Sequence, residues 1–256
     1  MILALLRKEL HEMRWKLLLG TGILTALAVT LPFLYEFILD MMQAFLSAGD
    51  FLSRFLPAEQ LKLLENYSFY IWSQWNAKNL YQIGLIFAIL TGMSLIAGET
   101  GSQTAHFLLT RPVSRRMIYF SKASAGALVL LLMVLISTAA IFLVTRFTPY
   151  SLEAGRLWLA TAITVLCLLS VYSLTLYCST VIDDPVRAGG AALLVILASS
   201  VLGWFPATRD FSLLAYIQGA QYFLQGAVPV LPLAVITMSG LLLLLAGALV
   251  FERKNF

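Results

Sequence analysis

Long apolar runs alternate with short polar connections along the chain. A helix needs roughly 20 apolar residues to cross a hydrocarbon layer about 30 Å thick, and six runs are close to that length. They predict transmembrane helices at residues 17–34, 80–98, 123–144, 158–182, 188–205 and 230–251. An isolated segment in lipid must be helical because nothing else there satisfies its backbone donors and acceptors. The pattern therefore predicts an all-α integral membrane protein, with one domain over residues 1–256.

Two connections carry an amphipathic pattern of their own. Apolar residues recur at helical spacing in 37–46, which predicts that the first helix continues at the outer surface. Pro57 fits the first turn of a short helix that extends to Leu64. In 206–229, apolar residues alternate with glutamines and predict further short helices. An interfacial belt is predicted from a group of aromatic residues, Tyr67, Phe69, Tyr70, Trp72 and Trp75. The first connection is interpreted either as a membrane-resting loop or as a substrate contact.

Composition agrees with this pattern. The residues are 60% hydrophobic and 12% charged, which excludes a water-soluble fold. The net charge of +4 does not indicate nucleic-acid binding, because the basic residues lie between apolar runs. Cys167 and Cys178 share one apolar run and are interpreted as packing residues.

The basic residues instead predict the topology. With the amino terminus in the cytoplasm, most of the 17 basic residues lie on the cytoplasmic side. The residues assigned to that side are Arg7, Lys8, Arg14, Lys16, Arg111, Arg115, Arg116, Lys122, Arg187, Arg253 and Lys254. Six helices then predict that both termini are cytoplasmic.

Catalytic chemistry is not indicated by the sequence. The apolar runs contain no pair of carboxylates, no serine with a histidine or lysine, and no group of metal-ligating residues. His11 and His106 lack the spacing of metal ligands. Ion-coupled transport is also disfavoured, since it usually needs ionisable residues at membrane depth. No metal or cofactor is expected on this chain.

The connection at 98–122 is the largest one predicted on the cytoplasmic side. Residues 102–109 can form a short helix, which Pro112 ends because the residue before a proline disfavours helical geometry. Ser114 is placed to cap the next helix. The pattern predicts a helix-turn-helix elbow, which we interpret either as a coupling element or as a basic anchor for anionic membrane lipids.

The order of these elements resembles the type-2 ABC transporter permeases. The resemblance rests on a basic amphipathic helix at 5–15, on Glu99 after the second apolar run, on the stretch Leu-Thr-Arg-Pro-Val-Ser-Arg-Arg at 109–116, and on Lys122. It implies export of an amphipathic or hydrophobic cargo such as a peptide, antibiotic or lipid. It also implies two copies of a separate ATPase subunit and a second permease, either the same chain or a paralogue.

Site residues also follow from the resemblance. Contacts with the ATPase are implied for the elbow, at Gln103, His106, Phe107, Leu108, Arg111, Arg115 and Arg116. The amphipathic amino-terminal helix, with Arg7, Lys8, Glu9 and Arg14, is implied to contact the same subunit. The chain has no G-x-x-x-x-G-K-[ST] motif, so ATP and Mg²⁺ are expected on the partner and this chain is expected to be no enzyme by itself.

Two questions stay open at this point. Glu99 either pairs with Arg115 or Lys122 as a contact that switches between states, or is an unpaired carboxylate at headgroup level. The function is either a permease or a membrane immunity or sensor protein that binds a toxin or partner without transport. The two functions can be separated by testing whether ATP hydrolysis by a partner depends on this chain.

Overall fold

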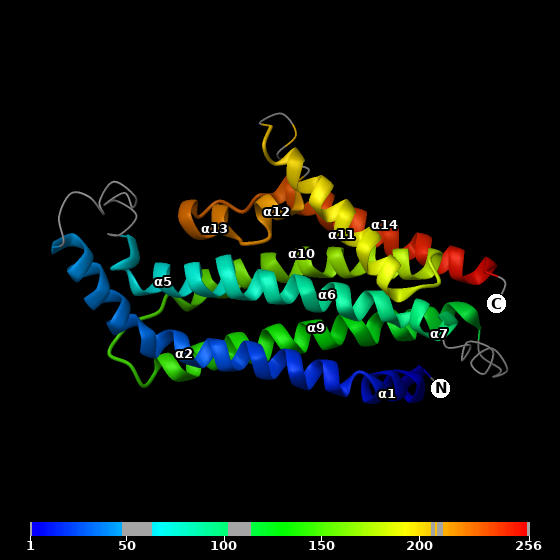
Figure 1. Cartoon of the computed structure of the whole chain (residues 1–256), viewed down its shortest axis with the longest axis horizontal. Helices are drawn as coiled ribbons and strands as arrows, with labels where there is room; N and C mark the ends of the chain where they lie inside the picture. The colour runs from blue at the N-terminus through cyan, green and yellow to red at the C-terminus, as the bar shows by residue number, and fades with distance from the viewer. Residues whose placement is uncertain (1, 48–62, 102–113, 206–207, 209–211, 255–256) are drawn as a thin grey trace.

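The computed structural model describes residues 2–47, 63–101, 114–205, 208 and 212–254. These residues are largely helical, and no strand occurs among them. Figure 1 shows the longer helices extending along a common direction in one elongated bundle. Five helices in the described part are long and apolar enough to cross a membrane. They are α2 (Arg14–Ser47), α9 (Arg115–Thr145), α10 (Ala154–Val181), α11 (Pro185–Leu202) and α14 (Val230–Arg253).

The predicted run at 80–98 has a different form from the other five. Helix begins earlier, with α5 (Tyr67–Gln74), and continues through the π-helix η1 (Trp75–Leu80) into α6 (Tyr81–Leu95). A bend at Ile96 then separates α6 from the short α7 (Ala97–Gly101). Because α6 has only 15 residues, it does not count among the five membrane-length helices. The structure therefore shows five such helices where the sequence predicted six.

The aromatic residues that precede α6 are mostly interior side chains. Tyr70 and Trp75 are 2% and 0% exposed, and Tyr67 and Trp72 are also buried. Trp75 donates its indole N–H to Thr138 on α9. The predicted interfacial belt is therefore wrong for these side chains, because they pack against neighbouring helices.

Helix α10 is the centre of the bundle. In its most apolar stretch 67% of the residues are buried, compared with 22% in α11 and 28% in α14. It packs against α6, α14 and α11. Several of its hydroxyl groups are satisfied inside the helix; for example, Thr175 and Thr180 donate to the carbonyls four residues earlier. Such bonding lets α10 carry polar residues in an apolar interior.

Small residues allow α6 to approach α10 closely. Gly84, Ala88 and Gly92 follow one another at four-residue intervals and are buried on one face of α6. A Cβ atom at Gly92 would lie 2.8 Å from the Cβ of Thr175 on α10. Larger side chains on this face would separate the two helices.

Both chain ends lie at one end of the bundle. Figure 1 shows α1 (Ile2–Glu12), the carboxy-terminal part of α14, and α7 together there. We refer to it as the terminal end. Which side of a membrane it faces remains a prediction.

The connecting segments confirm part of the pattern. Helix α2 continues unbroken to Ser47, as predicted for 37–46. The 206–229 connection contains the short helices α12 (Leu213–Tyr216) and α13 (Ala220–Gln225). Most of the helix predicted at 57–64 lies outside the described residues.

A group of four tyrosines packs at the opposite end of the bundle. Tyr35 contacts the rings of Tyr67, Tyr70 and Tyr150 at centroid distances of 4.8–5.0 Å. The rings of Tyr67 and Tyr150 stack at 5.1 Å. The Tyr67 hydroxyl bonds to Thr145 at 3.1 Å. We call these four residues the tyrosine cluster; it joins α2, α5 and the connection that follows α9.

Candidate functional site

A buried lysine joins three helices at the terminal end. Lys122, on α9, places its Nζ 2.8 Å from Glu9 Oε2 on α1 and 2.5 Å from Glu99 Oε1 on α7. The side chains of Lys122 and Glu9 are only 2% and 3% exposed, and that of Glu99 is 22% exposed. We call these three residues the Lys122 cluster. One ammonium group thus connects elements that are distant in the sequence.

Acidic groups outnumber basic groups in and beside the Lys122 cluster. Glu9, Glu12 and Glu99 each place one carboxylate oxygen within 4.8 Å of the others. Lys122 lies against two of these carboxylates, and Lys8 pairs with Glu12 at 3.2 Å. The cations beside this acidic group are therefore lysine side chains of the same chain.

Burial and charge act in opposite directions on Glu99. Burial raises the pKa of this carboxyl above its ordinary value, while the Lys122 ammonium acts to lower it. The net shift is upward, so the Glu99 carboxylate is less stable here than in water. The charge of this carboxylate therefore depends on the Lys122 ammonium beside it.

Amphipathic spacing brings Glu9 into the interior. Leu5, Glu9 and Met13 follow at four-residue intervals and are all buried, so they lie on one face of α1 and of the turn that follows it. This face packs against α9. Glu9 is the only charged residue of the three, and Lys122 compensates for its burial.

The bend before α7 fixes the position of Glu99. Ser179 on α10 accepts hydrogen bonds from the backbone N–H groups of Ile96 and Ala97, at 3.2 and 2.9 Å. Its hydroxyl donates to the carbonyl of Met93 at 2.9 Å. A single α10 side chain therefore satisfies the backbone groups that the end of α6 leaves free.

The first turn of α9 is also bonded to the end of α14. Arg115 donates to the carbonyls of Glu252 and Lys254, at 3.1 and 2.6 Å. Arg116 pairs with the Glu252 carboxylate at 2.8 Å. Lys254 in turn lies 2.6 Å from Asp183, between α10 and α11. The start of α9 is thus connected to α1, α7 and α14.

Comparison with known families decides the class of protein. A family model described as "ABC-2 family transporter protein" matches residues 3–254, nearly the whole chain. The chain belongs to the ABC-2 transporter family. Among curated proteins, none matches it. The family consists of membrane proteins that generally work with a separate ABC ATPase, and the resemblance noted from the sequence is confirmed.

In this ABC-2 protein the predicted coupling residues fall into two groups. Five lie outside the described residues: Gln103, His106, Phe107, Leu108 and Arg111. Arg115 and Arg116 are described, and both contact α14 within the chain. The elbow remains a prediction, although the predicted cap is confirmed, since Ser114 accepts from the N–H of Met117.

The predicted amino-terminal residues differ in exposure. Arg7 and Arg14 are exposed and Lys8 is partly exposed, whereas Glu9 is buried. The pairing of Glu99 with Lys122 is present, and its suggested gating role stays a prediction. Sequence reasoning missed Glu9 as a partner of Lys122. Its four-residue spacing from Leu5 and Met13 was the available signal.

Proposed function

We propose that this chain is the permease subunit of an ATP-driven exporter. The observation that supports this most directly is the Lys122 cluster in a member of the ABC-2 family. It joins α7 and α9, which flank the 102–113 connection, to α1. A partner that moves this connection would therefore act on three helices at once. Such an arrangement suits a chain whose helices are moved by a separate subunit.

The energy would come from a separate subunit. The sequence offers no phosphate-binding loop, so ATP and Mg²⁺ would be bound by the partner ATPase. Two ATPase copies and a second permease, identical or paralogous, would complete the transporter. Closure of the ATPases would displace the connection and change the relation of α7 to α9.

Lys122 makes a specific contact that this displacement of α7 relative to α9 would change. Its ammonium has two acidic partners on different helices, Glu9 on α1 and Glu99 on α7. Loss of the Glu99 contact would release α7 while the Glu9 contact still holds α1. A contact of this kind has two discrete states, as a switching transition requires.

The surface of the bundle bears on the cargo. Helices α11 and α14 expose many large apolar side chains, among them Leu194, Leu231 and Leu242. A cargo that enters from the membrane would therefore be amphipathic or hydrophobic, such as a peptide, antibiotic or lipid. Together α5, η1 and α6 would form the sixth crossing of the cytoplasmic membrane, with both termini in the cytoplasm.

The test is to purify the tagged chain in mild detergent and assay ATP hydrolysis. We expect a co-purifying ATPase whose activity falls when Phe107 or Leu108 is replaced by serine. A cysteine at His106 should cross-link to that ATPase. A chain that purifies alone, without hydrolysis in any lipid tested, would refute the proposal and favour the immunity or sensor function.

A further inference from the structure

The π-helix η1 interrupts a helical segment that otherwise extends from one end of the bundle toward the other. Its six residues, Trp75–Leu80, follow α5 directly and lead directly into α6. Each π-helical hydrogen bond joins residues five apart, whereas an α-helical bond joins residues four apart. The segment therefore holds about one residue more than an α-helix turning through the same angle would need.

Hydrogen bonds attach the start of η1 to two neighbouring helices. Trp75, which is 0% exposed, donates its indole N–H to Thr138 on α9 at 3.2 Å. Asn76, also 0% exposed, donates from its side-chain amide to Thr161 and Thr164 on α10, at 3.2 and 3.4 Å. The end of η1 that adjoins α5 is therefore held by both α9 and α10.

A side chain of η1 supports the π-helical pairing itself. Asn79 donates from its side-chain amide to the carbonyl of Gln74, at 2.7 Å. In an α-helix the partner of this carbonyl would be the N–H of Lys78, four residues on, whereas in a π-helix it is that of residue 79. The Asn79 amide therefore reinforces π-helical pairing at this carbonyl. The side chain of Lys78 itself is exposed.

The first part of α6 has no comparable attachment. Across residues 81–89, all of which the structure describes, the side-chain hydrogen bonding present is local, from Gln82 to the hydroxyl of Tyr81. Gly84 and Ala88 face α10 here and have no polar side-chain group. Packing alone therefore joins these residues to the neighbouring helices, and packing permits a change of angle more readily than fixed hydrogen bonds do.

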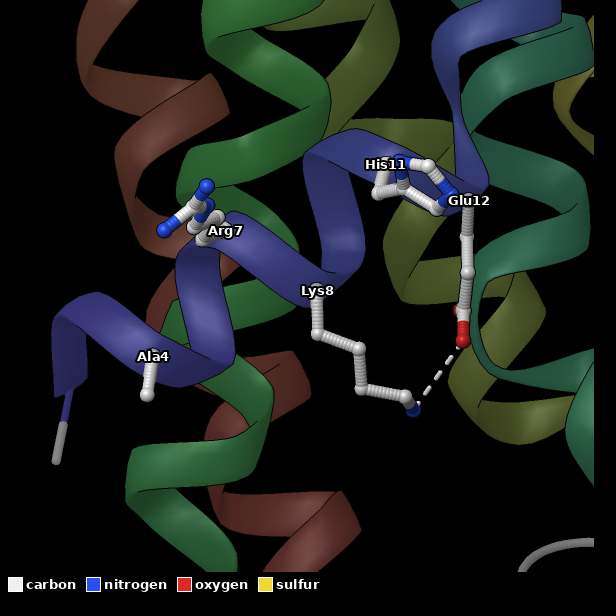
Figure 2. Close-up of a pocket in the computed structure, with 5 residues that line it drawn as sticks. All are labelled: Ala4, Arg7, Lys8, His11 and Glu12. Carbon is white, nitrogen blue, oxygen red and sulfur yellow. Dashed lines mark ion pairs between the residues drawn. The ribbon is translucent and has the colours of Figure 1, made fainter.

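Polar contacts hold the segment again at the terminal end. Lys16 on α2 donates to the carbonyl of Leu90 on α6 at 3.2 Å. Beyond the bend, α7 joins the Lys122 cluster. Figure 2 shows α1, which joins the same cluster and carries a further ion pair between Lys8 and Glu12, at 3.2 Å. The loosely attached part of α6 thus lies between η1 and the terminal end.

We propose that η1 is a hinge at which α6 changes its angle to α5 when the terminal end moves. Sharp kinks in helices occur at π-helical turns, where the regular backbone pairing is interrupted. The bonds of Trp75 and Asn76 keep η1 and α5 in place, and α6 transmits a displacement of α7 as far as this point. The hinge rests on the proposed function, because the ATPase would supply the displacement.

The experiment removes one residue from η1. Deletion of Lys78 lets the segment form an α-helix, while the faces of α5 and α6 keep their relation to each other. Deletion of Ile86, which is 53% exposed within the regular α6, is the matched control because it rotates everything that follows by about 100°. We expect the first deletion to leave the thermal unfolding midpoint nearly unchanged and the second to lower it by several degrees. Equal lowering by both would overturn the proposal.

Hydrogen exchange in the purified chain measures the hinge without ATP. The backbone amides of residues 75–80 should exchange about tenfold faster than those of residues 160–170 in α10, because a hinge opens locally more often. Deletion of Lys78 should remove that difference, whereas Lys78→Gln keeps the residue count and should preserve it. Exchange at 75–80 that is as slow as in α10, or that the deletion leaves unchanged, would overturn the hinge.

ATP hydrolysis by the co-purified complex measures the use of the hinge. Deletion of Lys78 should lower the rate about fivefold or more, and Lys78→Gln should leave it unaltered. An unaltered rate after the deletion, or the same loss in Lys78→Gln, would overturn the hinge and leave the permease function standing. Absence of hydrolysis in the unaltered complex would instead refute the proposed function, and with it the movement that we assign to η1.

Discussion

The two ends of the bundle are held together by different chemistry. At the terminal end, charged side chains connect the helices, with Lys122 between Glu9 and Glu99 as the buried part. At the opposite end, Tyr35 and Tyr67 belong to a cluster of packed aromatic rings, in which the Tyr67 hydroxyl bonds to Thr145. Both groups join segments that are distant in the sequence, and most of their side chains are buried.

This difference bears on which end can change. An ion pair with two alternative partners has discrete states, and the balance between them responds to charge and to displacement of a helix. Stacked aromatic rings gain their energy from contact area and have no comparable second arrangement. The terminal end is therefore suited to change in response to a partner. The tyrosine cluster is suited to keep the helices at the opposite end in place during that change.

The largest expected effect is at the buried lysine. Lys122→Met leaves Glu9 buried without its cation, and breaking a buried pair in this way costs about 3–5 kcal/mol. We expect a lower thermal unfolding midpoint in detergent. The double variant Lys122→Met with Glu9→Gln should recover much of the loss, because the uncompensated charge is then absent. A double variant as unstable as the single one would contradict this explanation.

The tyrosine cluster should be nearly as sensitive to truncation. Tyr35→Ala removes a ring that is 2% exposed and contacts three other tyrosines. Loss of such a buried aromatic side chain costs about 3 kcal/mol through lost contacts and a cavity. The same melting assay measures it. Tyr35→Phe keeps the ring and should recover most of that loss; equal destabilisation by both would assign the effect to the hydroxyl.

A smaller effect is expected from one hydroxyl group in the same cluster. Tyr67→Phe keeps the stacked ring and removes the hydrogen bond to Thr145. The expected cost is about 1 kcal/mol, the usual net contribution of such a bond. A loss as large as that of Tyr35→Ala would show that hydrogen bonding, and not ring packing, holds this end.

The smallest effect is expected at the surface. Arg116 and Glu252 form an ion pair whose side chains are 61% and 41% exposed. Arg116→Gln should cost at most about 1 kcal/mol, because solvent screens such pairs. A change in melting as large as that of Lys122→Met would mean that the terminal end depends on its surface pairs as much as on its buried one.

Much of the fold was predictable from the apolar pattern, because lipid requires long helical runs. Five of the six predicted runs are membrane-length helices, and Ser114 caps α9 as its position before the helix suggested. The early start of α5 was not predictable, because the sequence around Trp75 is equally compatible with a buried tryptophan and with a tryptophan that faces the membrane. The structure distinguishes the two, since the Trp75 indole N–H donates to Thr138.

The candidate site was predictable in part. The position of Glu99 at the end of one apolar run and of Lys122 at the start of the next suggested that they could pair. Glu9 was grouped with Arg7, Lys8 and Arg14 as an implied contact of the ATPase, although its spacing from Leu5 places it on the buried side of α1. The bond from Arg115 to Lys254 joins residues 139 apart in the sequence, and no local pattern indicates it.

The most direct test is the rate of ATP hydrolysis by the complex that purifies with this chain. Glu99→Gln removes a charge at the proposed coupling contact and leaves the Lys122–Glu9 pair, whereas Tyr67→Phe alters the opposite end by one hydroxyl. We predict that Glu99→Gln lowers the rate about fivefold or more, and that Tyr67→Phe leaves it unchanged. Equal rates in both variants and the unaltered chain would contradict the claim that the drive enters at the terminal end.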